Sequence, residues 1–174
     1  MPVPEHLAGG DPMTATIDPA RATVGALLLL PLDDVRQVLA VVEDTDPDDP
    51  RLRAVLGFIR ALAEEGRRPD PVTVLAHARA SGEVRSSSVT SLAVLLTEVA
   101  TVEECPVPLA VGVYARALVE HAVRRRITEA AERLRNVADT GSVEGLHLVV
   151  EVECAAMVRA VSRLAVPVVV GGAR

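Results

Sequence analysis

One run of basic residues has the types and spacing to bind phosphate or an acidic partner. Three arginines are consecutive at 124–126, and others lie nearby in the same proline-free stretch. Guanidinium groups donate paired hydrogen bonds to phosphate and carboxylate oxygens, so a row of them on one helix is a candidate contact surface. The candidate partner or phosphate contacts are Arg116, Arg124, Arg125, Arg126, Arg133 and Arg135.

The same run also fits an ordinary solvated helix face. Three pairs of opposite charge have the four-residue spacing at which side chains meet along a helix: Glu120 with Arg124, Arg125 with Glu129, and Glu129 with Arg133. We favour this ion-pair ladder over a nucleic-acid site, because a compensated charge run normally faces solvent. The net charge of −6 also disfavours broad nucleic-acid binding, which needs a basic face.

No other reactive residues have the spacing of a catalytic or metal site. The acidic turn at 44–50, DTDPDDP, lacks the glycine and terminal glutamate of a calcium loop, so we interpret it as a solvated turn. All eighteen basic residues are arginine, which excludes a Walker A lysine and a lysine Schiff base. The histidines are scattered, at His6, His77, His121 and His147. We expect no enzyme, no metal and no cofactor.

Composition indicates one globular protein with an aliphatic core. The 174 residues suffice for one domain of ordinary size, and the apolar fraction is 49% with only 1% aromatics. The longest apolar runs, at 25–30 and 166–170, are far short of the ~20 residues that span a bilayer. Cys105 and Cys154 form no Cys-x-x-Cys pair, and no signal peptide pattern begins the chain. We therefore expect a cytoplasmic protein.

Three Asp-Pro pairs, at 18–19, 49–50 and 70–71, mark helix starts. The aspartate caps the helix, and proline in the first turn loses no hydrogen bond. Gly66 has the position of a left-handed cap at the end of the second of these helices. We predict a flexible leader over 1–17 and then a globular helical bundle over 18–106, with helices at 19–30, 33–42, 50–65, 71–82 and 89–100.

Two long helices are predicted after this bundle. Residues 108–138 are helical in pattern, and the turn that follows has Gly141 to end one helix and Ser142 to cap the next, which runs over 143–165. So short a turn folds the two helices into an antiparallel hairpin, over 107–165. The apolar tail, residues 166–174, is interpreted either as a linker remnant or, as we favour, as a strand docked on a neighbouring subunit.

The hairpin has more apolar residues than its own seam can cover, so we predict that it self-associates. Exposed aliphatic surface of this size is normally covered by a partner. The candidate self-association residues are Leu118, Val123, Ile127, Leu134, Leu146, Val150, Met157 and Val161.

Three stretches, in this order, resemble the N-terminal domain of the DnaB family of replicative helicases. They are VGALLLLPLDDVRQVL (24–39), LRAVLGFIRALAEEGRRPDPVTVLAHARASGEV (52–84) and YARALVEHAVRRRITEAAERL (114–134). The family's aromatic signature before its third helix is replaced by DTDPDDP, and its Gly-Gly-x-x-Tyr-Leu before the fifth by SSSVTSLAVLL (86–96). The likeness covers residues 20 to 165.

The resemblance implies an all-α fold, a compact helical bundle followed by a long antiparallel hairpin. In the family this domain dimerises through the hairpin, builds a trimer of dimers, and binds primase and loader proteins. We therefore predict a stand-alone interaction and oligomerisation module of DNA replication, without the ATPase domain, that binds or modulates the replicative helicase or primase. Two alternatives stay open: a nucleic-acid binder that uses the arginine-rich hairpin, and a purely structural homo-oligomer.

Overall fold

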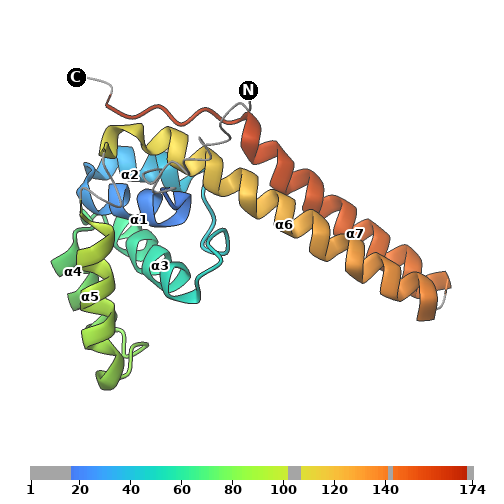
Figure 1. Ribbon diagram of the computed structural model, residues 1–174, viewed down its shortest axis with the longest axis horizontal. Helices are drawn as coiled ribbons and strands as arrows, with labels where there is room; N and C mark the ends of the chain where they lie inside the picture. The colour runs from blue at the N-terminus through green and yellow to red at the C-terminus, as the bar shows by residue number, and fades with distance from the viewer. Residues whose placement is uncertain (1–16, 102–106, 141–142, 172–174) are drawn as a thin grey trace, which may run out of the picture.

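The computed structural model describes residues 17–101, 107–140 and 143–171, in which every regular element is a helix and there is no strand. Figure 1 shows α1 to α5 gathered into a body from which α6 and α7 project side by side. The helices are α1 (Pro19–Leu29), α2 (Leu32–Leu39), α3 (Pro50–Glu64), α4 (Pro71–Ala80), α5 (Val89–Val99), α6 (Val111–Thr140) and α7 (Val143–Ser162), with short 3-10 turns η1 (Ser86–Ser88), η2 (Pro108–Ala110) and η3 (Arg163–Ala165). The predicted all-α fold class is confirmed.

The three predicted Asp-Pro starts are confirmed at α1, α3 and α4. Each aspartate accepts a hydrogen bond from the backbone N–H two residues later: Asp18 from Ala20 at 2.9 Å, Asp49 from Arg51 at 2.8 Å, and Asp70 from Val72 at 2.9 Å. Each proline occupies the first helical position, where its missing N–H costs nothing. Local sequence alone therefore fixes where three of the helices begin.

The body has its core around α3. This helix packs against α1, α2 and α4. Its buried stripe is aliphatic: Leu52, Val55, Leu56, Ile59 and Leu62 are all at most 2% exposed. Gly66 follows the helix in the left-handed region, with φ of 75°, as the sequence predicts. Apolar residues from the other helices of the body complete one continuous core.

The first half of α6 belongs to the core of the body as well as to the hairpin. Val111, Ala115, Leu118 and Val119 are buried in the same core cluster as α1 and α3. Helix α6 makes its most extensive packing with α1, and it packs next most extensively with α7. The hairpin is therefore anchored in the body by half of its first helix.

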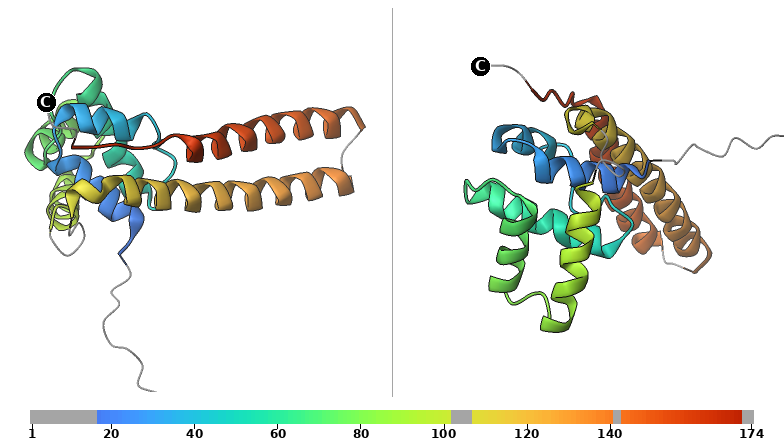
Figure 2. Two further views of the ribbon diagram at one scale, coloured as in Figure 1. Left: turned by 90° about the horizontal axis from the view of Figure 1, so that it is seen from above. Right: turned by 60° about the vertical axis from the view of Figure 1, so that its left-hand side comes forward.

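The described part of the apolar tail, residues 166–171, contacts the body of the same chain, and its docking on a neighbouring subunit stays a prediction. These residues run back along the body of the same chain (Figure 2). Val168 packs against the core, and its carbonyl oxygen lies so near Gly112 that a Cβ there would come within 2.9 Å of it. The Gly171 N–H donates to Asp34 Oδ1 at 3.2 Å. Gly112 thus allows the tail to cover the start of α6.

Some predictions fall on residues outside the described ranges. These are residues 1–16 of the leader, Cys105, and the caps Gly141 and Ser142. Among the helices that the structure does describe, none has the length and apolarity required to cross a bilayer.

Candidate functional site: the hairpin and its root

The two helices of the hairpin meet along a seam of small residues. Ala130 of α6 and Ala156 and Ala160 of α7 are buried there, and alanine allows the two backbones to approach closely. Figure 2 shows the pair running side by side from the body to the tip. Because the seam uses small side chains, it covers only a narrow strip of each helix.

A charged pair fixes the register of the hairpin farther out. Arg133 donates through Nε and Nη2 to the two carboxylate oxygens of Glu153, at 2.7 and 2.9 Å. The hydrogen bonds from Arg133 lower the pKa of Glu153, and the same bonds raise the pKa of Arg133. This two-point contact defines which turns of α6 and α7 lie opposite each other.

Six of the eight candidate self-association residues share one surface, which we call the apolar face. It consists of Ile127, Leu134, Leu146, Val150, Met157 and Val161. On α6, Ile127 and Leu134 are nine and sixteen positions after Leu118, so at 100° per residue they lie nearly opposite the side that packs on the body. The helical spacing of the α7 members places them on the same side of the hairpin.

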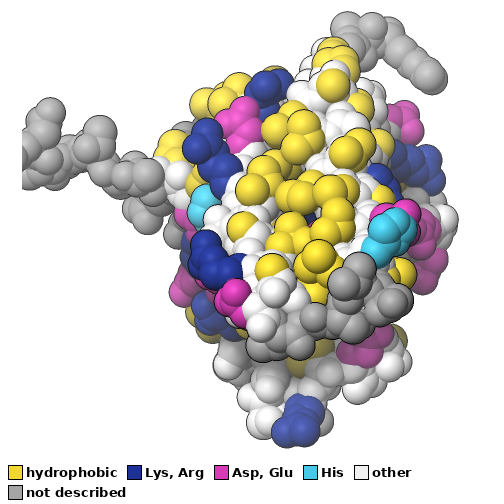
Figure 3. Space-filling view, turned by 90° about the vertical axis from the view of Figure 1, so that its right-hand side faces the viewer, with side chains coloured by type: hydrophobic (Ala, Val, Ile, Leu, Met, Phe, Trp, Pro, Cys, Tyr) yellow, Lys and Arg dark blue, Asp and Glu magenta, His cyan; other side chains and the backbone are white. Residues whose placement is uncertain are grey.

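The apolar face is open to solvent. Ile127, Val150 and Val161 are 44%, 39% and 48% exposed, and the other three members are half-buried. Figure 3 shows hydrophobic side chains forming a band down the hairpin, with Arg, Asp, Glu and His side chains at its margins. An apolar band with a charged rim is the arrangement found at protein interfaces.

The other two candidates, Leu118 and Val123, were wrongly placed on this surface. They are only 2% and 5% exposed and belong to the core of the body. Helical periodicity correctly identifies both as buried, but it does not distinguish burial against α1 from burial against another subunit.

The candidate arginines do not form one continuous row. Arg125 hydrogen-bonds to Asp48 and to the Thr45 and Asp46 carbonyls, Arg116 to Glu120 and the Leu164 carbonyl, and Arg133 to Glu153. Within the described residues, Arg124, Arg126 and Arg135 form no hydrogen bond or ion pair.

The predicted ion-pair ladder is correct at one of its three steps. Arg125 pairs with Glu129 at 3.7 Å, whereas Glu120 pairs with Arg116 and Arg133 pairs with Glu153. The partners that replace the ladder come from other turns or other elements. The candidate arginines therefore have different surroundings. Three of the six, Arg116, Arg125 and Arg133, hold the hairpin to itself or to the body.

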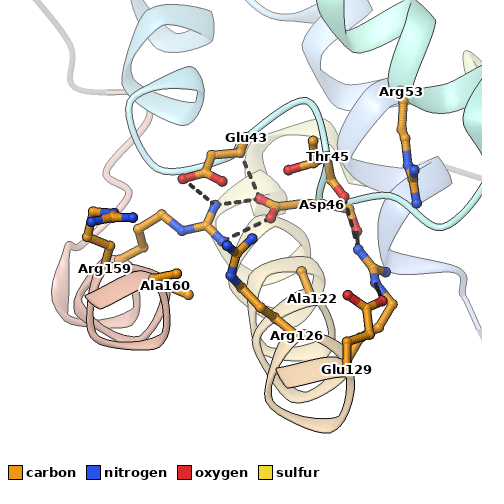
Figure 4. A pocket seen from close by; sticks show the side chains of 12 residues that line it. Glu43, Thr45, Asp46, Arg53, Ala122, Arg126, Glu129, Arg159 and Ala160 are labelled. Atoms are coloured by element: carbon orange, nitrogen blue, oxygen red, sulfur yellow. Dashed lines mark hydrogen bonds and ion pairs between the residues drawn. The ribbon is translucent and has the colours of Figure 1, made fainter. Parts of the chain in front are cut away.

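The acidic turn at 44–50 is not simply solvated, which corrects the sequence interpretation. Asp46 is 2% exposed and accepts two hydrogen bonds from Arg163, at 2.8 and 2.9 Å, and one from the Glu43 N–H at 2.8 Å (Figure 4). This buried pair ties the end of α7 to the body, and we call this region the root of the hairpin. Sequence reasoning missed both residues, because 117 positions separate them.

No group of three potential ligands among His, Cys, Asp and Glu comes together for a metal within the described ranges. At the root, the buried carboxylate of Asp46 is already hydrogen-bonded to Arg163. The surface features of the hairpin and its root are the apolar face and the arginines that gather at the root.

Comparison with known proteins identifies the fold. No family model matches the sequence, and no curated protein matches it. Nineteen chains of solved structures do match. One is the crystal structure of the N-terminal domain of DnaB helicase from Mycobacterium tuberculosis, which is 25% identical, has a TM-score of 0.66, and matches over 80% of this chain and 95% of that chain. The chain therefore has the fold of the DnaB N-terminal domain, and the resemblance drawn from the three sequence stretches is confirmed.

Proposed function

We propose that this chain is a non-catalytic interaction and oligomerisation module of DNA replication, which self-associates through the apolar face of its hairpin. The observation that carries the proposal is that face, whose Ile127, Val150 and Val161 stay substantially exposed, whereas the aliphatic stripe of α3 is buried in the core of the body. Burial of such a surface is favourable by about 25 cal/mol per Å². A second copy of the same hairpin would supply a matching surface.

The spacing of the apolar face suits helix-on-helix packing. Ile127 and Leu134 are seven residues apart, as are Val150 and Met157. A seven-residue repeat keeps apolar side chains on the same side of a helix and allows knobs to insert into holes of a facing helix. Two hairpins related by a two-fold axis would place each face on its copy, the commonest symmetry of homodimers.

The likeness to the DnaB N-terminal domain supports a partner in replication, which we propose to be the replicative helicase or primase. A chain with this fold would enter or cap a helicase ring and change the loading of that ring. The nucleic-acid alternative is less well supported, because Arg125 and Arg133 are held by carboxylates of the same chain. The structural homo-oligomer alternative differs from our proposal only in lacking the partner.

The test of self-association is the mass in solution by light scattering. We would compare the wild type with the variant Val150→Asp/Val161→Asp, which puts two charges on the apolar face. The matched control is Val72→Asp/Val94→Asp, because these valines are exposed on α4 and α5 of the body. We expect a dimer or a multiple of dimers for the wild type and the control, and a monomer for the hairpin variant. A monomeric wild type at tens of micromolar would contradict the proposal.

The test of the partner is capture of purified helicase and purified primase by the immobilised protein. We expect one of them to bind the wild type. If neither binds while self-association holds, the structural homo-oligomer becomes the better account. Retention on DNA that falls steeply with salt would instead favour the nucleic-acid alternative.

A further inference from the structure

A partly open cavity of about 350 Å³ lies at the root of the hairpin. It is bounded by the acidic turn of the body, by α6 and by α7, as Figure 4 shows. Ala122, Ala156 and Ala160 are among the residues that line it, and their small side chains leave the space between the helices unfilled. Residues of the body and of both hairpin helices thus line one space.

The lining of this cavity is dominated by arginine. Three carboxylates line it, from Glu43, Asp46 and Glu129. Five arginines surround the same space: Arg53, Arg125, Arg126, Arg159 and Arg163. Positive charge is therefore in excess around the cavity, although the whole chain carries a net charge of −6.

Several donors of these arginines have no acceptor. Arg126 of α6 and Arg159 of α7 form no hydrogen bond or ion pair with any residue that the structure describes. Arg163 uses both terminal nitrogens on Asp46, but its Nε is buried without a hydrogen-bond partner in the described chain. In Figure 4, Arg126 reaches from α6 toward Asp46, and Arg159 lies on α7 at the other side of the cavity.

The buried Arg163 Nε lacks an acceptor in the described chain, which is unfavourable unless a ligand supplies one. Arg126 and Arg159 are exposed, and no carboxylate of the described chain is hydrogen-bonded to them, so an incoming anion would displace only water. We propose that the root cavity binds a small phosphate-bearing ligand of about nucleotide size. A phosphate monoester carries nearly two negative charges and presents three acceptor oxygens, which matches donors that arrive from different helices. The volume is at the lower end of the range of small-molecule sites.

The geometry favours a small ligand over a nucleic-acid backbone. Arg126 and Arg159 come from α6 and α7 and line one partly enclosed space, whereas a nucleic-acid backbone requires charges spread along an open surface. Arg124 and Arg135, the other arginines of α6 without a partner in the described chain, do not line the cavity. A ligand in the cavity would contact the body and both helices at once, and so would stabilise the attachment of the hairpin.

The experiment is calorimetric titration of the full chain with inorganic phosphate, a nucleoside monophosphate and a nucleoside diphosphate, together with the thermal unfolding midpoint in each. The test variant is Arg126→Gln/Arg159→Gln, and the matched control is Arg124→Gln/Arg135→Gln, which removes the same charge away from the cavity. None of these four residues forms a hydrogen bond or ion pair in the described chain, so both variants should fold.

We expect at least one probe to bind the wild type and the control with equal affinity and to raise their unfolding midpoints by several degrees. The test variant should lose about tenfold or more in affinity. Equal losses in both variants, or no binding of any probe at millimolar concentration, would overturn the proposal. The proposal would also be overturned if a single-stranded oligonucleotide bound the protein and both variants weakened that binding equally. Neither variant alters the apolar face, so the result is independent of self-association.

Discussion

The body and the hairpin are built from the same few residue types, but only the body encloses them in a core that is closed on all sides. In α3, Ile59 is fully buried by neighbouring helices of the same chain, whereas Ile127 of α6 is 44% exposed. The difference arises because five helices and half of a sixth enclose the core of the body, while the outer hairpin has one neighbour on one side. An aliphatic composition therefore gives a closed core in one region and an exposed apolar face in the other.

The sharpest test of this contrast replaces one isoleucine in each region with alanine. Ile59→Ala should lower the free energy of unfolding by about 4 kcal/mol, since it leaves a cavity in a closed core. Ile127→Ala should lower it by about 0.5 kcal/mol or less in a monomer, because solvent already reaches that side chain. Urea denaturation at low protein concentration measures both. Equal losses would mean that the two regions do not differ in this way.

A second prediction concerns the root of the hairpin, where Arg163 pairs with Asp46 of the body. Arg163→Met should destabilise the protein by about 3 kcal/mol, because the buried Asp46 carboxylate loses its partner. The double variant Asp46→Asn/Arg163→Met should recover part of this loss, since no uncompensated charge remains. A double-mutant cycle from urea denaturation gives the coupling energy. Additive losses would show that the pair contributes nothing beyond its separate residues.

A third prediction tests the aspartate cap at the start of α4, which the local sequence predicts. Asp70→Ala should cost about 1 kcal/mol, because two backbone N–H groups of α4 lose their acceptor. Asp70→Asn should retain most of the stability, since an amide oxygen also caps a helix. Urea denaturation at neutral pH measures both, and equal losses in the two variants would contradict the capping role.

The charge of Asp70 also makes the stability of the protein depend on pH. Burial would raise the pKa of Asp70, but hydrogen bonds from Thr73 and Val72 outweigh it and lower the pKa below the usual 3.8. The folded state therefore binds the proton less readily than the unfolded state. The contribution of the charged cap is present above pH 4 and is lost as the pH falls through the lowered pKa. Asp70→Asn should remove this part of the acid sensitivity.

The smallest expected effect is in the outer hairpin. Glu153→Gln weakens the two-point contact with Arg133 and should leave the unfolding midpoint of the body nearly unchanged, because the pair lies beyond the core. Amide exchange in the second half of α6 and in α7 should become faster, as local opening no longer breaks that contact. Glu151→Gln is the control, since Glu151 is exposed and its ion pair is with His147 of the same helix.

The candidate site was only partly predictable from the sequence, because helical spacing shows which side of a helix is apolar but not what covers that side. Six residues of the apolar face follow from helical spacing, whereas Leu118 and Val123 have the same apolar character and are covered by the body. The arginines that line the root cavity are even harder to predict from the sequence. Arg126 was a candidate as part of a basic run, but Arg159 and Arg163 stand singly in α7 and η3, and no local pattern distinguishes them from surface arginines.

The sequence by itself determined the order of the helices, the three aspartate caps and the antiparallel hairpin, because caps, turns and periodicity act between residues a few positions apart. Only the tertiary structure decided which apolar stripe is core and which is surface, where the tail docks, and that Asp46 meets Arg163 across 117 positions. Periodicity shows which side of a helix is apolar. What covers that side depends on elements brought together by the whole fold, and no local pattern encodes them.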